Sequence, residues 1–200
     1  MINENFVILG ALISFLGGLS YLVSTVKGKT KPNRVTWFFW TLAPFVVLGG
    51  QVSQGVWAAS LITFMAGFNP MLIFIASFWN KNSVWKLQKF DYLCGALALL
   101  GIILWQITKI GDMAILFGIL ADFIAAIPTF IKTYKFPQTE NYKIYLAGII
   151  NAVITLLTIK VWELKNFAFA VNVLVICSLL CFLILRRRFI KPVTKKGSAI

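Results

Sequence analysis

The sequence contains no histidine and few charged residues. Asp and Glu together number only 6 of 200 residues, and all charged residues make up 12% of the chain. A water-soluble globular protein keeps about a quarter of its residues charged, so this composition excludes that class. The missing histidine removes the commonest metal ligand and the usual acid or base at neutral pH. We therefore expect no metal, no cofactor and no enzymatic activity.

Apolar residues are abundant, in contrast to the few charged ones. They make up 60% of the chain, including 18 Phe and 7 Trp, which excludes intrinsic disorder. A bilayer core about 30 Å thick needs about 20 apolar residues in a helix. Seven segments approach this length, and the first is expected to be a retained helix because no basic stretch precedes it. The prediction is an all-α polytopic membrane protein with transmembrane helices at 6–26, 35–51, 56–79, 92–108, 113–134, 143–159 and 167–185.

The positive charges are distributed unevenly over the two sides of these spans. Sixteen of the 19 Lys and Arg residues fall in or beside the loops after the first, third and fifth spans or after the last span, and only Lys109, Lys160 and Lys165 fall on the other side. The positive-inside rule then predicts an outside N-terminus and a cytoplasmic C-terminus in a plasma membrane. The net charge of +13 needs no nucleic-acid partner. The basic tail, residues 186–200, is expected to contact anionic lipid head groups.

An internal repeat appears at an offset of 108 residues. Residues 19–27 align with 127–135, and residues 32–37 align with 140–145. Polar or small identities include Gly10 with Gly118, Lys27 with Lys135 and Asn33 with Asn141. The copies fall on the first three and last three helices, so a single linker helix leaves both in the same orientation. We predict a three-helix repeat at 1–80, a linker at 81–111, a second repeat at 112–185 and a tail at 186–200.

The repeat and its topology resemble the SWEET and PQ-loop superfamily of small-solute carriers. Residues 134–138 (YKFPQ) contain a Pro-Gln pair after the predicted helix, and residues 127–134 (IPTFIKTY) resemble the family motif with Thr129 in place of Gln. The resemblance covers nearly the whole chain by architecture and a short part of it by motif. It indicates a divergent member of bacterial type, with transport by alternating access between two three-helix bundles.

The same resemblance suggests roles for individual residues. Of four hinge prolines expected in such a carrier, Pro44 and Pro128 are present, while Ser20 and Ala152 occupy the other two places. Pro44, Pro128 and additionally Pro70 interrupt helical hydrogen bonding and are expected to act as hinges. Each family repeat also uses an Asn of its third helix to hold substrate, and Asn69 and Asn172 match that role.

Polar groups at mid-span indicate a site independently of the family resemblance, because hydrocarbon disfavours unpaired polar groups. The candidates are Asn69, Asp122, Asn151 and Asn172. Asp122 is the only deep acid, so we expect it to be protonated at rest or open to water. It then serves either as a proton-coupling group or as a neutral hydrogen-bonding group between helices. Each Asn binds substrate or bridges helices.

Trp40, near the start of the second span, stacks on a sugar ring or cation in one interpretation and packs against other helices in the other. The leading hypothesis is a carrier for a small, sugar-like polar solute, with Asn69, Asn151, Asn172 and Trp40 binding it. The alternatives are a proton-coupled carrier of amino acids or small metabolites that uses Asp122, and a non-transporting receptor or assembly protein on the same scaffold. The sequence leaves the oligomeric state open.

Overall fold

The computed structural model describes residues 2–83, 85–108 and 110–189, with side chains except at 101, 105, 106, 108 and 187–189. Within this part the chain forms seven α-helices, two short 3-10 helices (η1, η2) and no β-strand. In chain order they are α1 (Phe6–Val26), α2 (Arg34–Ser53), α3 (Ser60–Ala76), η1 (Lys81–Ser83), α4 (Lys89–Thr108), α5 (Gly111–Lys135), η2 (Pro137–Thr139), α6 (Tyr142–Thr158) and α7 (Leu164–Phe189).

Each predicted span coincides with one helix, and α3 is shorter than its predicted span. It was expected at 56–79 and is found at Ser60–Ala76. Gly55 has a φ of 75°, a left-handed conformation that glycine adopts without strain, and it turns the chain out of α2 before α3 begins. Trp57 and Trp79, which extended the apolar run in the sequence, lie outside the helix and are 74% and 80% exposed.

The C-terminal tail also differs from its prediction. Helix α7 continues to Phe189 and includes the first arginines of the expected tail, because arginine is a good helix former. Arg186 donates a hydrogen bond to the carbonyl of Tyr134, and its guanidinium lies 3.8 Å from the centre of that ring. The expected lipid-binding residues Lys191, Lys195 and Lys196 lie outside the described residues, as does Lys109.

The two asparagines matched at the offset of 108 residues have the same local role. The Asn33 side chain accepts hydrogen bonds from the backbone N–H of Val35 and Thr36 at the start of α2. The Asn141 side chain accepts one from the N–H of Lys143 at the start of α6. Asn is a preferred N-cap because its side chain satisfies these otherwise unpaired donors. Both asparagines therefore fix the point at which their helix begins.

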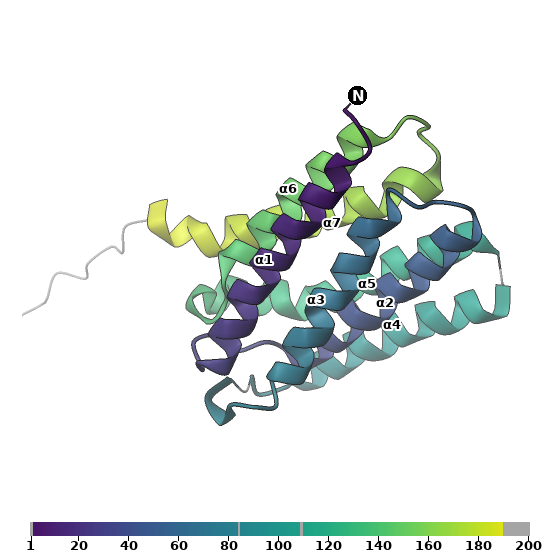
Figure 1. Cartoon of the computed structure of the whole chain (residues 1–200). Coiled ribbons are helices and arrows are strands. Elements are labelled where there is room, and N and C mark those ends of the chain that lie inside the picture. The colour runs from purple at the N-terminus through teal and green to yellow at the C-terminus, as the bar shows by residue number, and fades with distance from the viewer. Residues whose placement is uncertain (1, 84, 109, 190–200) are drawn as a thin grey trace, which may run out of the picture.

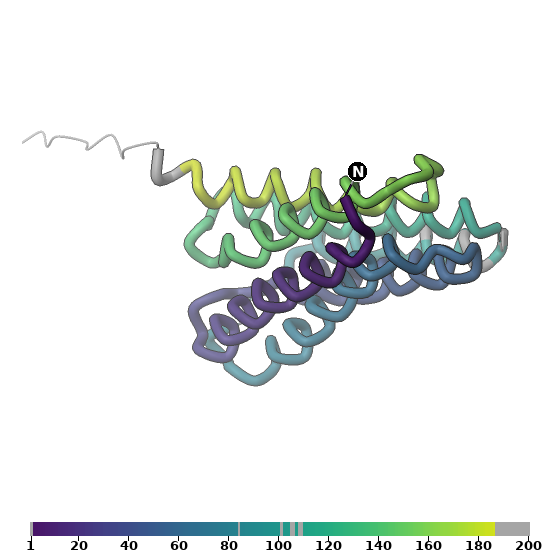
Figure 2. The backbone as a smooth tube through the Cα atoms, turned by 45° about the horizontal axis from the view of Figure 1, so that its top comes forward, coloured from purple at the N-terminus to yellow at the C-terminus, as the bar shows by residue number. Residues whose placement is uncertain are grey.

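The helices pack in a regular pattern (Figure 1). α3 contacts both α1 and α2, and α7 contacts both α5 and α6. Between these two sets, α1 packs along α6 and α2 packs along α5, while α4 lies against α5 and α2. Figure 2 shows the helices as one bundle, with α7 and α1 on different sides of it. Side chains of α1, α2, α3, α5, α6 and α7 can therefore meet in the interior, and Ala98 of α4 belongs to the main buried cluster.

The outer surface is apolar and the interior contains many polar residues. On α1, Leu12 and Leu16 are 56% and 64% exposed, whereas Thr25, Thr36 and Thr129 are fully buried. Four described helices, α1, α2, α5 and α7, are long and apolar enough to cross a bilayer, and α3 and α6 are shorter apolar helices. A hydrocarbon solvent favours this distribution. The chain is accordingly a helical membrane protein.

Candidate functional site

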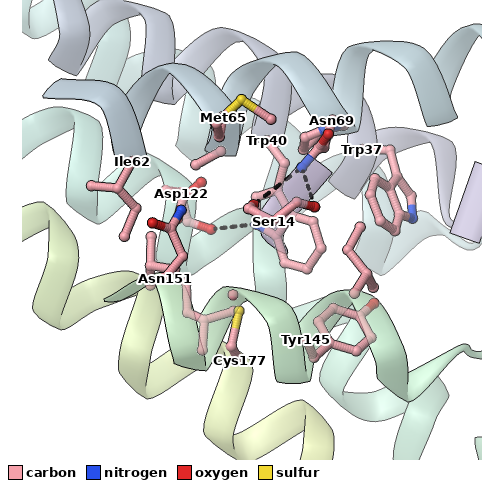
Figure 3. A pocket seen from close by; sticks show the side chains of 16 residues that line it. Ser14, Trp37, Trp40, Ile62, Met65, Asn69, Asp122, Tyr145, Asn151 and Cys177 are labelled. Atoms are coloured by element: carbon pink, nitrogen blue, oxygen red, sulfur yellow. Dashed lines mark hydrogen bonds between the residues drawn. The ribbon is translucent and has the colours of Figure 1, made fainter. Parts of the chain in front are cut away.

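A cavity of about 80 Å³ lies where α1, α2, α3, α5, α6 and α7 meet. Aliphatic and aromatic side chains form most of its wall, and four polar side chains complete it: Ser14, Asn69, Asp122 and Asn151 (Figure 3). A dry cavity that holds benzene has about 150 Å³, and a single water needs about 10–15 Å³. The cavity therefore has room for several waters, and it must widen before a sugar-sized molecule can enter.

Asp122 is the acidic residue of this cavity. It is 5% exposed, and its Oδ2 accepts a hydrogen bond of 2.8 Å from Nδ2 of Asn172 on α7. No Lys or Arg in the described part of the chain forms an ion pair with it. Its backbone carbonyl accepts a hydrogen bond of 3.1 Å from Nε1 of Trp40. The carboxylate is thus held by a single side-chain hydrogen bond.

Asn69 and Asn151 reach the cavity from α3 and α6, and each packs against a glycine of α1. Nδ2 of Asn69 donates to the carbonyl and the hydroxyl of Ser14, at 3.0 and 3.2 Å. A Cβ at Gly18 would overlap the Asn69 amide, and a Cβ at Gly10 would overlap the Asn151 amide. The Oδ1 atoms of both asparagines are buried without a hydrogen-bond partner. The two glycines therefore create the space in which these amides lie.

Asn172 lies beside the cavity instead of lining it. It is 7% exposed, and its amide donates to Asp122. Its position supports an orienting role for Asn172 toward the carboxylate. The structure thus brings four of the five predicted solute-contacting or proton-coupling residues, Asn69, Asn151, Trp40 and Asp122, to the cavity wall and places the fifth directly behind Asp122.

Aromatic rings form the part of the cavity wall that lies nearest the C-terminal ends of α1 and α5. Trp37 and Trp40 meet edge to face with centroids 5.3 Å apart, and Trp40 lies 6.5 Å from the ring of Tyr145. Tyr21 packs on Trp37 at 4.7 Å. Trp37 and Trp40 therefore contact each other on one face of α2, and Trp40 both packs and lines the cavity.

The predicted hinge prolines all lie within helices. Pro44 is in α2, Pro70 in α3 and Pro128 in α5. Pro70 follows Asn69 directly and also lines the cavity. A proline removes one helical hydrogen bond, so each of these helices has a local weak point near the centre of the bundle.

A group of four buried residues, which the sequence did not reveal, closes the bundle beside the aromatic wall. We call Tyr21, Lys132, Glu140 and Tyr145 the buried latch. Lys132 and Glu140 form an ion pair whose side chains are 1% and 0% exposed. Oε2 of Glu140 also accepts hydrogen bonds from the hydroxyls of Tyr21 and Tyr145, at 2.9 and 2.8 Å.

The latch links α1, α5, α6 and the loop that contains η2. Lys132 donates a further hydrogen bond of 2.5 Å to the carbonyl of Lys31. From the sequence, Lys132 was expected only to contribute to the positive charge that orients the chain in the membrane. The available signal was Glu140, one of two acids among the many basic residues on that side, the other being Asp91.

Comparisons with known proteins give no further assignment. No protein-family model matches the chain, no curated protein matches it, and no solved structure matches its fold.

Proposed function

We propose that the protein is a membrane carrier that moves a small polar solute by alternating access. The observation that carries this proposal is the cavity, where Asn69, Asp122 and Asn151 converge at the meeting point of six helices. Polar groups at this depth in a bilayer are costly, and they commonly mark the path of a solute or ion. The resemblance to SWEET and PQ-loop carriers favours a sugar-like solute.

In the proposed carrier, seven spans form two parallel three-helix units, α1–α3 and α5–α7, joined by α4. The helix contacts support this arrangement. If α1 corresponds to α5 and α2 to α6, the contact of α1 with α6 is equivalent to the contact of α5 with α2, and both contacts are present. Parallel repeats of this kind surround a pathway at their interface. The positive charge of the loops favours a plasma membrane with the N-terminus outside and the C-terminus in the cytoplasm.

The conformation corresponds to a closed state of this carrier. The buried latch seals one end, which the charge rule assigns to the cytoplasm. Near the other end, Ile62, Ala152 and Ala170 form a buried apolar cluster. Access from either side then requires the two units to separate at that end, with Pro44, Pro70 and Pro128 as the bending points.

Ligand screening followed by counterflow tests the proposal. The purified protein is screened for thermal stabilisation by sugars, amino acids and small amines, because a bound ligand raises the melting temperature. Each stabilising solute is then measured in counterflow with proteoliposomes. We expect saturable exchange, lost in Asn69→Ala and kept in Leu116→Ala, a lipid-facing change on α5. Stabilisation without exchange of any solute would instead indicate a receptor.

A second candidate function is proton-coupled transport through Asp122. The observation that favours it is the carboxylate without an ion-pair partner. An imposed pH gradient should then drive accumulation of a neutral solute. Asp122→Asn should abolish this accumulation while exchange at equal pH continues. Accumulation that is unaffected by the substitution would exclude coupling through this residue.

A further inference from the structure

The cavity contains a carboxyl group that has no positively charged partner in the described chain. Oδ2 of Asp122 has one hydrogen bond, and Oδ1 has no hydrogen-bond partner among the described residues. The cavity wall includes no Lys or Arg, and its other titratable groups, Tyr145 and Cys177, carry no positive charge. An ionised carboxylate buried without a counter-charge is strongly unfavourable. A ligand of positive charge would supply the missing partner.

The aromatic part of the wall suits the same ligand. Trp37, Trp40 and Tyr145 line the cavity, and the faces of such rings attract cations, most strongly when water is excluded. Trp40 is fixed to the backbone carbonyl of Asp122 by its Nε1 hydrogen bond. The Trp40 ring is therefore held beside Asp122, and Figure 3 shows both residues at the cavity.

The same wall disfavours ligands that carry a carboxylate. The wall offers no protein cation to the acid group of a zwitterion, because no Lys or Arg lines it and the buried Lys132 is already paired with Glu140 in the latch. A neutral sugar would leave Asp122 without a counter-charge. Positive charge on a compact, partly apolar body is the chemistry that the cavity complements.

We propose that this cavity, once it widens, binds a small organic monocation without a carboxylate, such as a substituted ammonium compound. Its charge lies between Asp122 and the rings of Trp37 and Trp40, and Asn69 and Asn151 contact its polar substituents. That this ligand is transported rests on the proposed carrier function. That it is bound does not.

Three probes of similar size test the proposal. Choline is the cation, 3,3-dimethylbutan-1-ol is its uncharged carbon isostere, and betaine adds a carboxylate. Binding of radiolabelled choline to the purified full chain is measured directly, and the other two probes compete with it. We expect both to bind about tenfold more weakly than choline or worse. Asp122→Asn should abolish choline binding, while Asp122→Glu and Leu116→Ala should retain it.

Should Asp122→Asn fail to fold, Trp40→Leu and Trp40→Phe replace it, and only the phenylalanine variant should bind choline. Equal binding of choline and its isostere would overturn the proposal, as would choline binding by a folded Asp122→Asn protein. Binding of a sugar without choline would overturn it and leave the carrier function intact. Choline binding that needs Asp122 without counterflow would support the ligand class and contradict the carrier function.

Discussion

The two ends of the bundle are held together by different interactions. At the end with the basic loops, the ion pair of Lys132 and Glu140 is almost completely buried and includes two tyrosine hydroxyls. At the other end, the ion pairs among the described residues are Glu4 with Lys160 and Glu163 with Lys165, both substantially exposed.

This difference has an energetic meaning. An exposed ion pair contributes about 0–1 kcal/mol, whereas removing one partner of a buried pair costs about 3–5 kcal/mol. In the proposed carrier, opening the end with the basic loops would therefore require the buried ion pair of the latch to break and its charges to regain water. The other end is closed mainly by apolar contacts, such as those of Val47, Ile115 and Phe169, which separate without exposing a buried charge pair.

The largest expected effect comes from breaking the latch. Glu140→Ala leaves Lys132 buried without its counter-charge, and we expect a loss of about 3–5 kcal/mol in the free energy of unfolding in detergent. The matched change at the other end, Glu163→Ala, should cost about 1 kcal/mol or less because that pair is exposed. Equal losses in the two variants would remove the distinction between the ends.

A smaller effect is expected from removing one latch hydroxyl. Tyr145→Phe keeps the ring and deletes one of the two hydroxyl donors to Glu140, at a cost of about 1.5–3 kcal/mol because the acceptor is a carboxylate. Tyr92→Phe, at a side chain that is 60% exposed, serves as the control and should change stability little. Chemical unfolding of both variants measures the difference. An unchanged Tyr145→Phe protein would mean that this hydroxyl does not stabilise the latch.

Gly18 and Gly49 allow a comparison between a tightly packed and an open position in the bundle. Gly18→Ala would drive a Cβ into the Asn69 amide, and we expect a loss of about 1–3 kcal/mol from overpacking. Gly49 lies near the C-terminal end of α2, and a Cβ added there would have no neighbouring atom within 4 Å. Gly49→Ala should be neutral or stabilise the helix by up to about 1 kcal/mol. Thermal unfolding of the two alanine variants should thus give shifts that differ in size and in sign. Similar losses in both would argue against the close packing at Gly18.

The smallest effect is expected at Gln51. Its Nε2 donates to the carbonyl of Lys165, while its Oε1 is buried without a partner. Gln51→Met removes one hydrogen bond and one unpaired acceptor together, so the net change should stay within about 1 kcal/mol. A loss as large as that of Glu140→Ala would show that a polar contact also governs this end.

The helices and the cavity residues could be predicted because they depend on local rules. Apolar runs locate the helices, and a polar residue such as Asp122 inside such a run is expected to face the interior. The latch could not be predicted in this way. Glu140 follows α5 in a short loop, and its hydroxyl partner Tyr21 lies 119 residues away, so only tertiary packing brings them together. The ends of α3 were missed because hydropathy does not separate a buried apolar residue from an exposed one such as Trp57.

Gly10 and Gly18 also restrict how α1 can move. The absence of a side chain at Gly10 leaves space for the amide of Asn151 of α6, and the same absence at Gly18 leaves space for the amide of Asn69 of α3. Sliding α1 lengthwise by one turn would bring bulkier residues against both amides at once. Displacement of this helix is consequently confined to tilting as a rigid rod, with Gly10 and Gly18 kept against the two amides.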